Sequence, residues 1–108
     1  IEATLERLHG DREFLKVLYA AFLDDLDERI KKIEGAVASR DFQEILVRSH
    51  ALKGAAKTIG ATRTSLLSID LEQAAGQQDG NLIHTAWKSL GHELDRVRLA
   101  MNQYINQK

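Results

Sequence analysis

A histidine, a lysine and a glycine stand close together in the run SHALKGAA at residues 49–56, as His50, Lys53 and Gly54. Residues three and four positions apart share one side of a helix, so these three lie together if the run is helical. Glycine costs a helix interior about 1 kcal/mol relative to alanine, which indicates that the surface beside His50 needs open space. An exposed imidazole with a cation beside it is suited to holding a phosphoryl group that a partner protein must reach.

The other three histidines lack this surrounding pattern. None of His9, His84 and His92 is followed by a lysine three positions later and a glycine four positions later, and we interpret them as ordinary surface residues. His84 and His92 stand eight positions apart, so they do not form the helical metal pair that two histidines four apart would make. The chain has no cysteine, which excludes disulfides and thiolate-bound metals. We therefore expect no metal site.

Length and composition predict one ordinary globular domain with a single core. The chain has 108 residues, of which 44% are hydrophobic and 29% charged. Its formal net charge of -1 argues against a nucleic acid as partner. There is no signal peptide and no apolar run near the roughly 20 residues of a membrane span, so we expect a cytoplasmic domain without direct membrane contact. The chain begins at Ile1, which we interpret as a domain cut from a longer protein.

Apolar residues recur at spacings of three and four, and there is no proline, so the sequence predicts an all-α fold. We expect a short helix over 3–8, followed by a long helix capped by Asp11. A third helix should begin at Asp41 and end near Gly60. A fourth should be capped by Thr62 and run to about 75, and the last should begin at Asp79 or Asn81. Asp41 and Glu44 resemble a capping box. Short loops between long amphipathic helices predict an antiparallel up-down four-helix bundle with a short extra N-terminal helix, as a single domain over 1–108.

The apolar stripes of these helices define the expected core. They are Leu15, Leu18, Phe22, Leu26, Ile30, Ile33 and Val37 in the second helix; Ile45, Leu52, Ala55, Ala56 and Ile59 in the third; and Ile83, Ala86, Leu90, Leu94, Val97, Met101 and Tyr104 in the last. His50 lies roughly 160° around the helix from Leu52, so it points outward. Arg48 falls at the edge of the core face, where its charged end can reach water.

Several residues on the outer side are candidates for contact with a partner. Leu46 and Val47 either pack partly against neighbouring helices or form an apolar docking patch around His50. Lys57 and Arg63 either belong to a solvated face or contribute to the partner surface. Gly54 contributes by leaving space.

The segment from Arg48 to Gly80 resembles the histidine-containing phosphotransfer (HPt) domain of bacterial multistep phosphorelays. The family's pattern is a histidine, then Leu-Lys-Gly with small residues, a Gly-Ala pair, and Leu-Glu about a helix later. The matching residues are His50, Leu52, Lys53, Gly54, Ala55, Ala56, Gly60, Ala61, Leu71 and Glu72. The opening LERL at 5–8 with Gly10-Asp11 also resembles the family's start, so the resemblance covers nearly the whole chain. Thr64 departs from the pattern, because many members have an apolar residue there.

The resemblance implies that His50 receives a phosphoryl group from a receiver-domain aspartate and passes it to another receiver. Lys53 would offset the charge of the phosphoryl group. Glu72, by analogy, would orient the imidazole ring, or else it is a solvated surface residue. The partners implied are receiver domains of response regulators or of a hybrid sensor kinase, and the isolated domain is expected to be a monomer. The chain has no nucleotide-binding motif, so we expect a carrier without a cofactor of its own, with Mg²⁺ in the partner receiver. The parent chain would be a free shuttle or the cytoplasmic end of a membrane-bound hybrid kinase.

Two other functions remain open at this level. The chain could serve as a helical protein-interaction module that is not phosphorylated, or as the phosphorylated domain of a chemotaxis-type kinase. Transfer of label from a phosphorylated receiver to His50 separates the first of these from a phosphocarrier.

Overall fold

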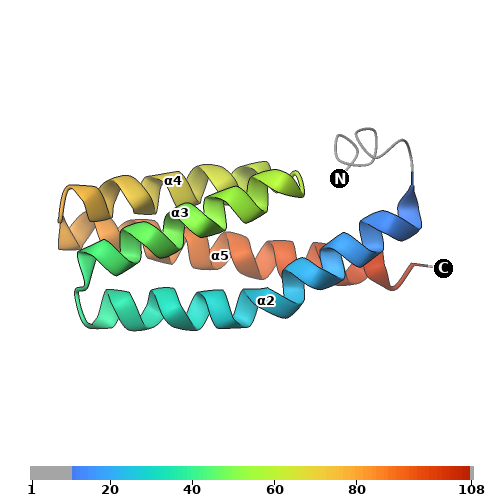
Figure 1. The fold of residues 1–108 in the computed structure, drawn as a ribbon, viewed down its shortest axis with the longest axis horizontal. Helices are drawn as coiled ribbons and strands as arrows, with labels where there is room; N and C mark the ends of the chain where they lie inside the picture. The colour runs from blue at the N-terminus through green and yellow to red at the C-terminus, as the bar shows by residue number, and fades with distance from the viewer. Residues whose placement is uncertain (1–10, 108) are drawn as a thin grey trace.

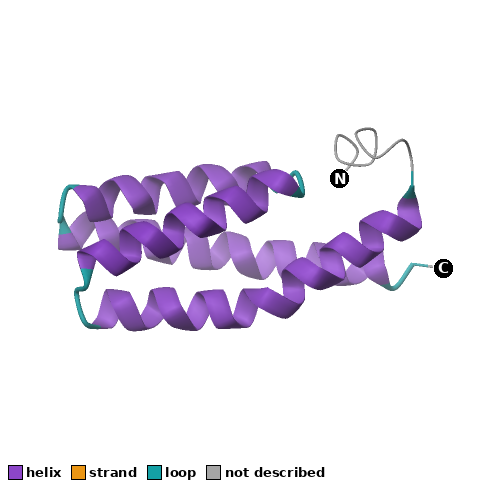
Figure 2. Ribbon diagram, viewed as in Figure 1, coloured by secondary structure: helices purple, strands orange, loops and turns teal. Residues whose placement is uncertain are grey.

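Four helices joined by short turns make up the part of the chain that the computed structural model describes, residues 11–107 (Figure 1). They are α2 (Arg12–Ala38), α3 (Phe42–Thr58), α4 (Thr62–Gly76) and α5 (Gly80–Ile105). Residues 11–107 contain no strand, as Figure 2 shows, and the all-α prediction is confirmed. The short helix expected over 3–8 lies outside the described residues.

The helices pack as a ring in which each contacts two neighbours. The contacting pairs are α2 with α3, α3 with α4, α4 with α5, and α5 with α2. Consecutive helices run in opposite directions, as the colours of Figure 1 show. The ends of α2 and α5 nearest the chain termini extend past the shorter α3–α4 hairpin. This is the arrangement expected of amphipathic helices joined by short loops.

Aspartate side chains begin three of the four helices. Asp11 accepts a hydrogen bond from the Phe14 N–H at 2.8 Å, and Asp41 accepts one from the Glu44 N–H at 3.1 Å. Asp79 likewise caps α5, at 3.1 Å from two backbone nitrogens. The capping prediction for Thr62 is wrong, because Ala61 holds the cap position of α4 and provides no side-chain acceptor.

The three turns between helices share one geometry. Arg40, Gly60 and Gln78 have φ values of 56°, 76° and 55°, in the left-handed region. The N–H of the residue that follows each one donates to a carbonyl five positions back, from Asp41 to Ala36, Ala61 to Ala56, and Asp79 to Ala74. This is the Schellman ending, which closes a helix and redirects the chain within three residues. Only Gly60 has the residue type that adopts this conformation without steric cost.

The core lies where the predicted stripes meet. In α3, Ile45, Leu52, Ala56 and Ile59 are buried, and Ala55 is half-buried. In α2 and α5 the stripe residues are also buried, except for Leu18, Ile30, Val37 and Ala86, which are half-buried. Thr64, the departure from the family pattern, is fully buried, and its hydroxyl has no hydrogen-bond partner within 11–107. Within the same residues, no helix is long and apolar enough to span a bilayer.

Candidate functional site

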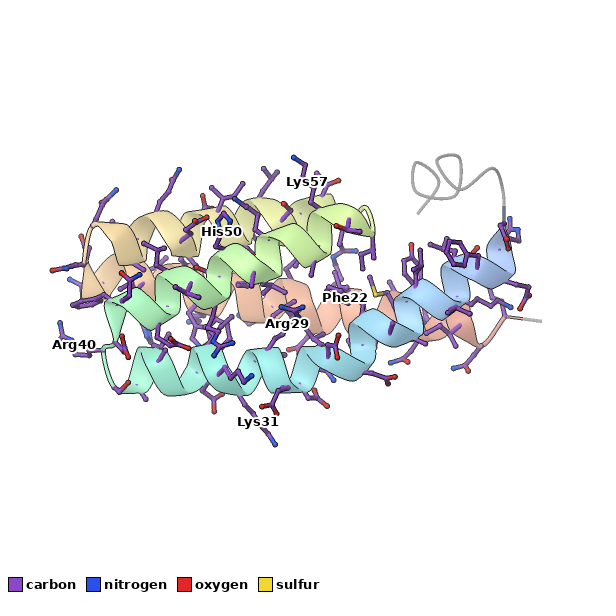
Figure 3. The ribbon with its side chains drawn as sticks, viewed as in Figure 1. Phe22, Arg29, Lys31, Arg40, His50 and Lys57 are labelled. Atoms are coloured by element: carbon purple, nitrogen blue, oxygen red, sulfur yellow. The ribbon has the colours of Figure 1, made fainter. Side chains whose placement is uncertain are left out.

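His50 lies near the middle of α3 on the side that faces away from the core. Its side chain is 61% exposed, whereas Leu52, two positions later, is fully buried. Figure 3 shows the ring on the outer face of the α3–α4 hairpin. The helical-wheel prediction for this residue is therefore confirmed, and the ring is open to a protein that approaches from outside.

Glu72 of α4 holds one nitrogen of the His50 ring. Its Oε2 lies 2.8 Å from Nδ1, and the carboxylate is only 22% exposed. An ionised carboxylate can only accept hydrogen bonds, so this contact favours the tautomer with the proton on Nδ1. The lone pair then resides on Nε2, which has no hydrogen-bond partner within residues 11–107. A neutral imidazole with a free Nε2 is a competent nucleophile.

Lys53 completes the cluster from the next turn of α3. Its Nζ lies 3.7 Å from Glu72 Oε1 and 3.2 Å from His50 Nδ1. The second distance is not a hydrogen bond when Nδ1 carries the proton, because the ammonium is also only a donor. We therefore assign Lys53 to Glu72. In this arrangement Lys53 and Glu72 neutralise each other, and the side chain of Lys53 stays close enough to His50 to meet a negative charge on the ring.

Gly54 lies beside His50, and the space around it is open. A Cβ added there would meet no heavy atom within 4 Å beyond its own helical surroundings. The position does not require a glycine for packing, since no neighbouring helix approaches it. The sequence argument that the surface beside His50 is open is consistent with this geometry.

The remaining candidate partner residues are in different surroundings. Val47 is 45% exposed, whereas Leu46 is half-buried and packs against the core beside Gly76 of α4. Lys57 is exposed on the same face as His50 (Figure 3). Arg63 is bound elsewhere, with its Nε 3.4 Å from Glu93 of α5. No contact within 11–107 joins Arg63 to the His50 cluster.

Sequence reasoning missed several buried polar residues, among them Ser49 and Glu93. Ser49, beside His50, is fully buried, and its hydroxyl donates to the Ile45 carbonyl at 2.7 Å. Glu93 has a side chain only 4% exposed, on the wall of a cavity of about 520 Å³, and it binds Arg96 as well as Arg63. The hydrogen bond to Glu93 raises the pKa of the Arg96 guanidinium. Arg96 follows Glu93 by three positions, so the two share one face of α5. This spacing could have predicted the ion pair between them from the sequence.

Fold and site together define a helical-bundle domain with one exposed, oriented histidine on the α3–α4 hairpin. The chain belongs to the Hpt domain family, whose sequence model matches residues 17–103. The resemblance found in the sequence is thus confirmed.

A solved structure similar to this chain is that of histidine-containing phosphotransfer protein B (HptB) from Pseudomonas aeruginosa PAO1. The match has a TM-score of 0.90 at 21% sequence identity and covers 100% of this chain and 95% of that one. At this identity the similarity establishes the fold. None of the curated proteins compared with the chain matches it.

Proposed function

We propose that this domain is a phosphohistidine carrier, in which His50 accepts a phosphoryl group from a receiver-domain aspartate and passes it to a second receiver. The observation that carries the proposal is the 2.8 Å contact between His50 Nδ1 and Glu72 Oε2, which leaves Nε2 as the reactive nitrogen. Nε2 attacks the phosphorus of the aspartyl phosphate, the N–P bond forms, and the P–O bond to the aspartate breaks. The aspartate leaves as a carboxylate. Nδ1 keeps its proton, and Glu72 stabilises the positive charge that develops on the ring.

Lys53 has a separate role in this proposal. The transferred group carries close to two negative charges, and Lys53 lies one helical turn from the accepting ring. Its ammonium can move from Glu72 toward the phosphoryl oxygens, because a lysine side chain has four flexible carbons. The charge would then be stabilised most where it develops, in the transition state.

The metal and much of the catalytic machinery belong to the partner in this scheme. The sequence has no phosphate-binding glycine loop, and residues 11–107 contain no cluster of three metal-ligating side chains. We propose that the receiver supplies Mg²⁺ and that this domain, acting as a monomer over 1–108, supplies the histidine. The parent protein would be a free shuttle or a hybrid sensor kinase, and the genomic context of the chain decides between them.

Labelling from phosphorylated receivers tests the proposal. Receiver domains phosphorylated with acetyl phosphate are mixed with the wild-type domain, and acid-labile, alkali-stable phosphate on the domain is measured. We expect label on the wild type and on the matched controls His84→Gln and His92→Gln, and none on His50→Gln. All variants should melt close to the wild type, because the three histidines are exposed. Label on His50→Gln contradicts the assignment, and an unlabelled wild type across all receivers favours the non-phosphorylated interaction module.

A further inference from the structure

A groove of about 290 Å³ lies between α2 and α3, next to the candidate site. Its lining is charged apart from one small residue, and consists of Asp25, Glu28, Arg29, Lys32, Arg48 and Ala51. Ala51 directly follows His50 in α3 and is exposed. The groove is therefore continuous with the surface that carries the reactive ring.

The two sides of His50 differ in how they are filled. At 100° per residue, Leu46 and Lys53 lie on one side of His50, and Ala51 and Gly54 lie on the other. The first side faces α4, where Lys53 contacts Glu72 and Leu46 lies by Gly76. The second side faces α2 and has Gly54, Ala51 and the exposed Val47 next to the ring. Ala51 also lines the groove, so a partner that reaches His50 from this side must cover the groove as well.

Within the groove, Arg29 is the cation that makes no ion pair with the described residues, although Asp25 stands one helical turn before it on α2. Lys32 pairs with Glu28 at 3.8 Å, and Arg48 pairs with Glu44 at 2.5 Å. No ion pair or side-chain hydrogen bond to Arg29 occurs within residues 11–107, and the side chain is half-buried. Figure 3 shows Arg29 on the side of α2 toward α3, whereas Lys31 points away on the opposite side. A partly desolvated guanidinium with free donors is suited to a carboxylate, which it can bind through two parallel hydrogen bonds.

We infer that the α2–α3 groove is the recognition surface for the receiver, and that Arg29 selects receivers that place a carboxylate over it. The inference rests on the proposed function, since the partner is the receiver that exchanges phosphate with His50. Arg29 touches neither His50 nor the transferred group, so it acts on docking and not on the chemical step. Charged groups around an interface mainly set the association rate and the choice of partner.

A charge-reversal pair tests this inference. Arg29→Glu and the matched control Lys31→Glu change the net charge by the same amount on opposite sides of α2. Transfer to each is measured over a range of concentrations of a receiver, phosphorylated with acetyl phosphate, that labels the wild type. We expect Arg29→Glu to lower kcat/KM at least tenfold through KM, with the maximal rate within about twofold of the wild type. Lys31→Glu should have kcat/KM and a maximal rate within twofold of the wild type. Arg29→Lys should have a smaller loss of kcat/KM than Arg29→Glu. The defect of Arg29→Glu should shrink in 0.5 M NaCl, because salt screens the new repulsion.

The outcomes separate this inference from the proposed function. If both reversals lower kcat/KM equally, or if the effect of Arg29→Glu lies in the maximal rate, Arg29 is not a recognition residue, although His50 remains the phosphate acceptor. If wild-type label is absent with every receiver, the proposed function fails and the recognition role fails with it. Unchanged melting of Arg29→Glu is the check that the variant is folded.

Discussion

His50 on α3 and Glu72 on α4 are joined by a 2.8 Å contact between Nδ1 and Oε2, across the hairpin that the two helices form. They are 22 positions apart in the sequence, so the turn at Gly60 and the packing of α3 on α4 set this distance. The contact fixes which ring nitrogen is free. In the proposed function, the reactivity of the histidine thus depends on the register of two helices.

Removal of the Glu72 carboxylate should change the tautomer of His50. In Glu72→Ala we expect a mixture of the two neutral ring forms, where the wild type has the proton mainly on Nδ1, and phosphate acceptance about tenfold slower, the scale of one hydrogen bond to a charged group. Ring ¹⁵N chemical shifts report the tautomer, and labelling rates report acceptance. Glu72→Gln keeps an acceptor oxygen and should lie closer to the wild type. A wild-type ¹⁵N pattern in Glu72→Ala would show that the carboxylate does not orient the ring.

Lys53 should matter more to transfer than to folding. Lys53→Ala is expected to slow phosphate acceptance by one to two orders of magnitude, as for one lost electrostatic donor. Its free energy of unfolding should change by no more than about 0.5 kcal/mol, since a single partly exposed ion pair at 3.7 Å contributes little. Rapid-quench labelling and urea denaturation measure the two effects, with Lys31→Ala as the matched control. An unchanged rate would place Lys53 in the solvated face only.

Substitutions at Gly54 separate docking from stability. Gly54→Ala should stabilise the domain by up to about 1 kcal/mol, because the added Cβ meets open space and the helix loses a glycine. Gly54→Gln should also fold, yet it should block receiver binding and phosphate transfer. Gly91, another helical glycine with open space around it, gives the matched control Gly91→Gln, which should fold and transfer normally. Normal transfer by Gly54→Gln would show that the partner does not approach over this surface.

The turn before α5 carries a removable strain. Gln78 has φ 55°, a conformation that costs a non-glycine residue about 1 kcal/mol or more. Gln78→Gly should therefore raise the midpoint of urea denaturation, with a gain of up to about 1 kcal/mol after the greater unfolded-state entropy of glycine is subtracted. Gln77→Gly, whose φ of -84° is ordinary, is the control and should not stabilise the domain. A loss of stability in Gln78→Gly would mean that the glutamine side chain contributes contacts that outweigh the strain.

Tyr19 should make the domain sensitive to alkali. Burial, and then the neighbouring Tyr104, raises the pKa of the Tyr19 phenol above its ordinary value of 10.0. As pH rises, Tyr19 loses its proton in the unfolded chain before it does in the folded domain. The contribution of Tyr19 to the free energy of unfolding is therefore constant below pH 10 and falls as pH rises toward the folded-state pKa. Urea denaturation at pH 9 and pH 11 should show a smaller decline for Tyr19→Phe than for the wild type. Equal declines would assign the alkaline sensitivity to other groups.

Much of the fold follows from patterns that repeat along the chain. Apolar spacings of three and four located α2, α3 and α5, and aspartates marked the starts of these three helices. The start of α4 was misassigned because Thr62 has a capping side chain, but the Schellman bond from Ala61 to Ala56 positions the cap one residue earlier. Ser49 was missed because a serine hydroxyl can return its hydrogen bond to its own helix and so be buried at little cost.

The site was predictable where it depends on one helix and less so where it depends on two. His50, Lys53 and Gly54 share a face of α3 by spacing alone, and the structure places them as expected. The proximity of Glu72 came only from the family resemblance, since no local spacing relates residues on different helices. Arg63 shows the limit of such reasoning, because its binding to Glu93 depends on how α4 meets α5.

The atoms of the His50, Lys53 and Glu72 contacts all come from the α3–α4 hairpin, and none comes from α2. Substitution of exposed residues of α2 during evolution therefore leaves the contacts among His50, Lys53 and Glu72 in place. A duplicated copy of this domain could acquire a new α2 surface, and with it a new set of contacts, while the chemistry on the hairpin stays under separate selection. If His50 carries phosphate as proposed, this division would let the choice of partner change through α2 while the His50, Lys53 and Glu72 contacts stay the same.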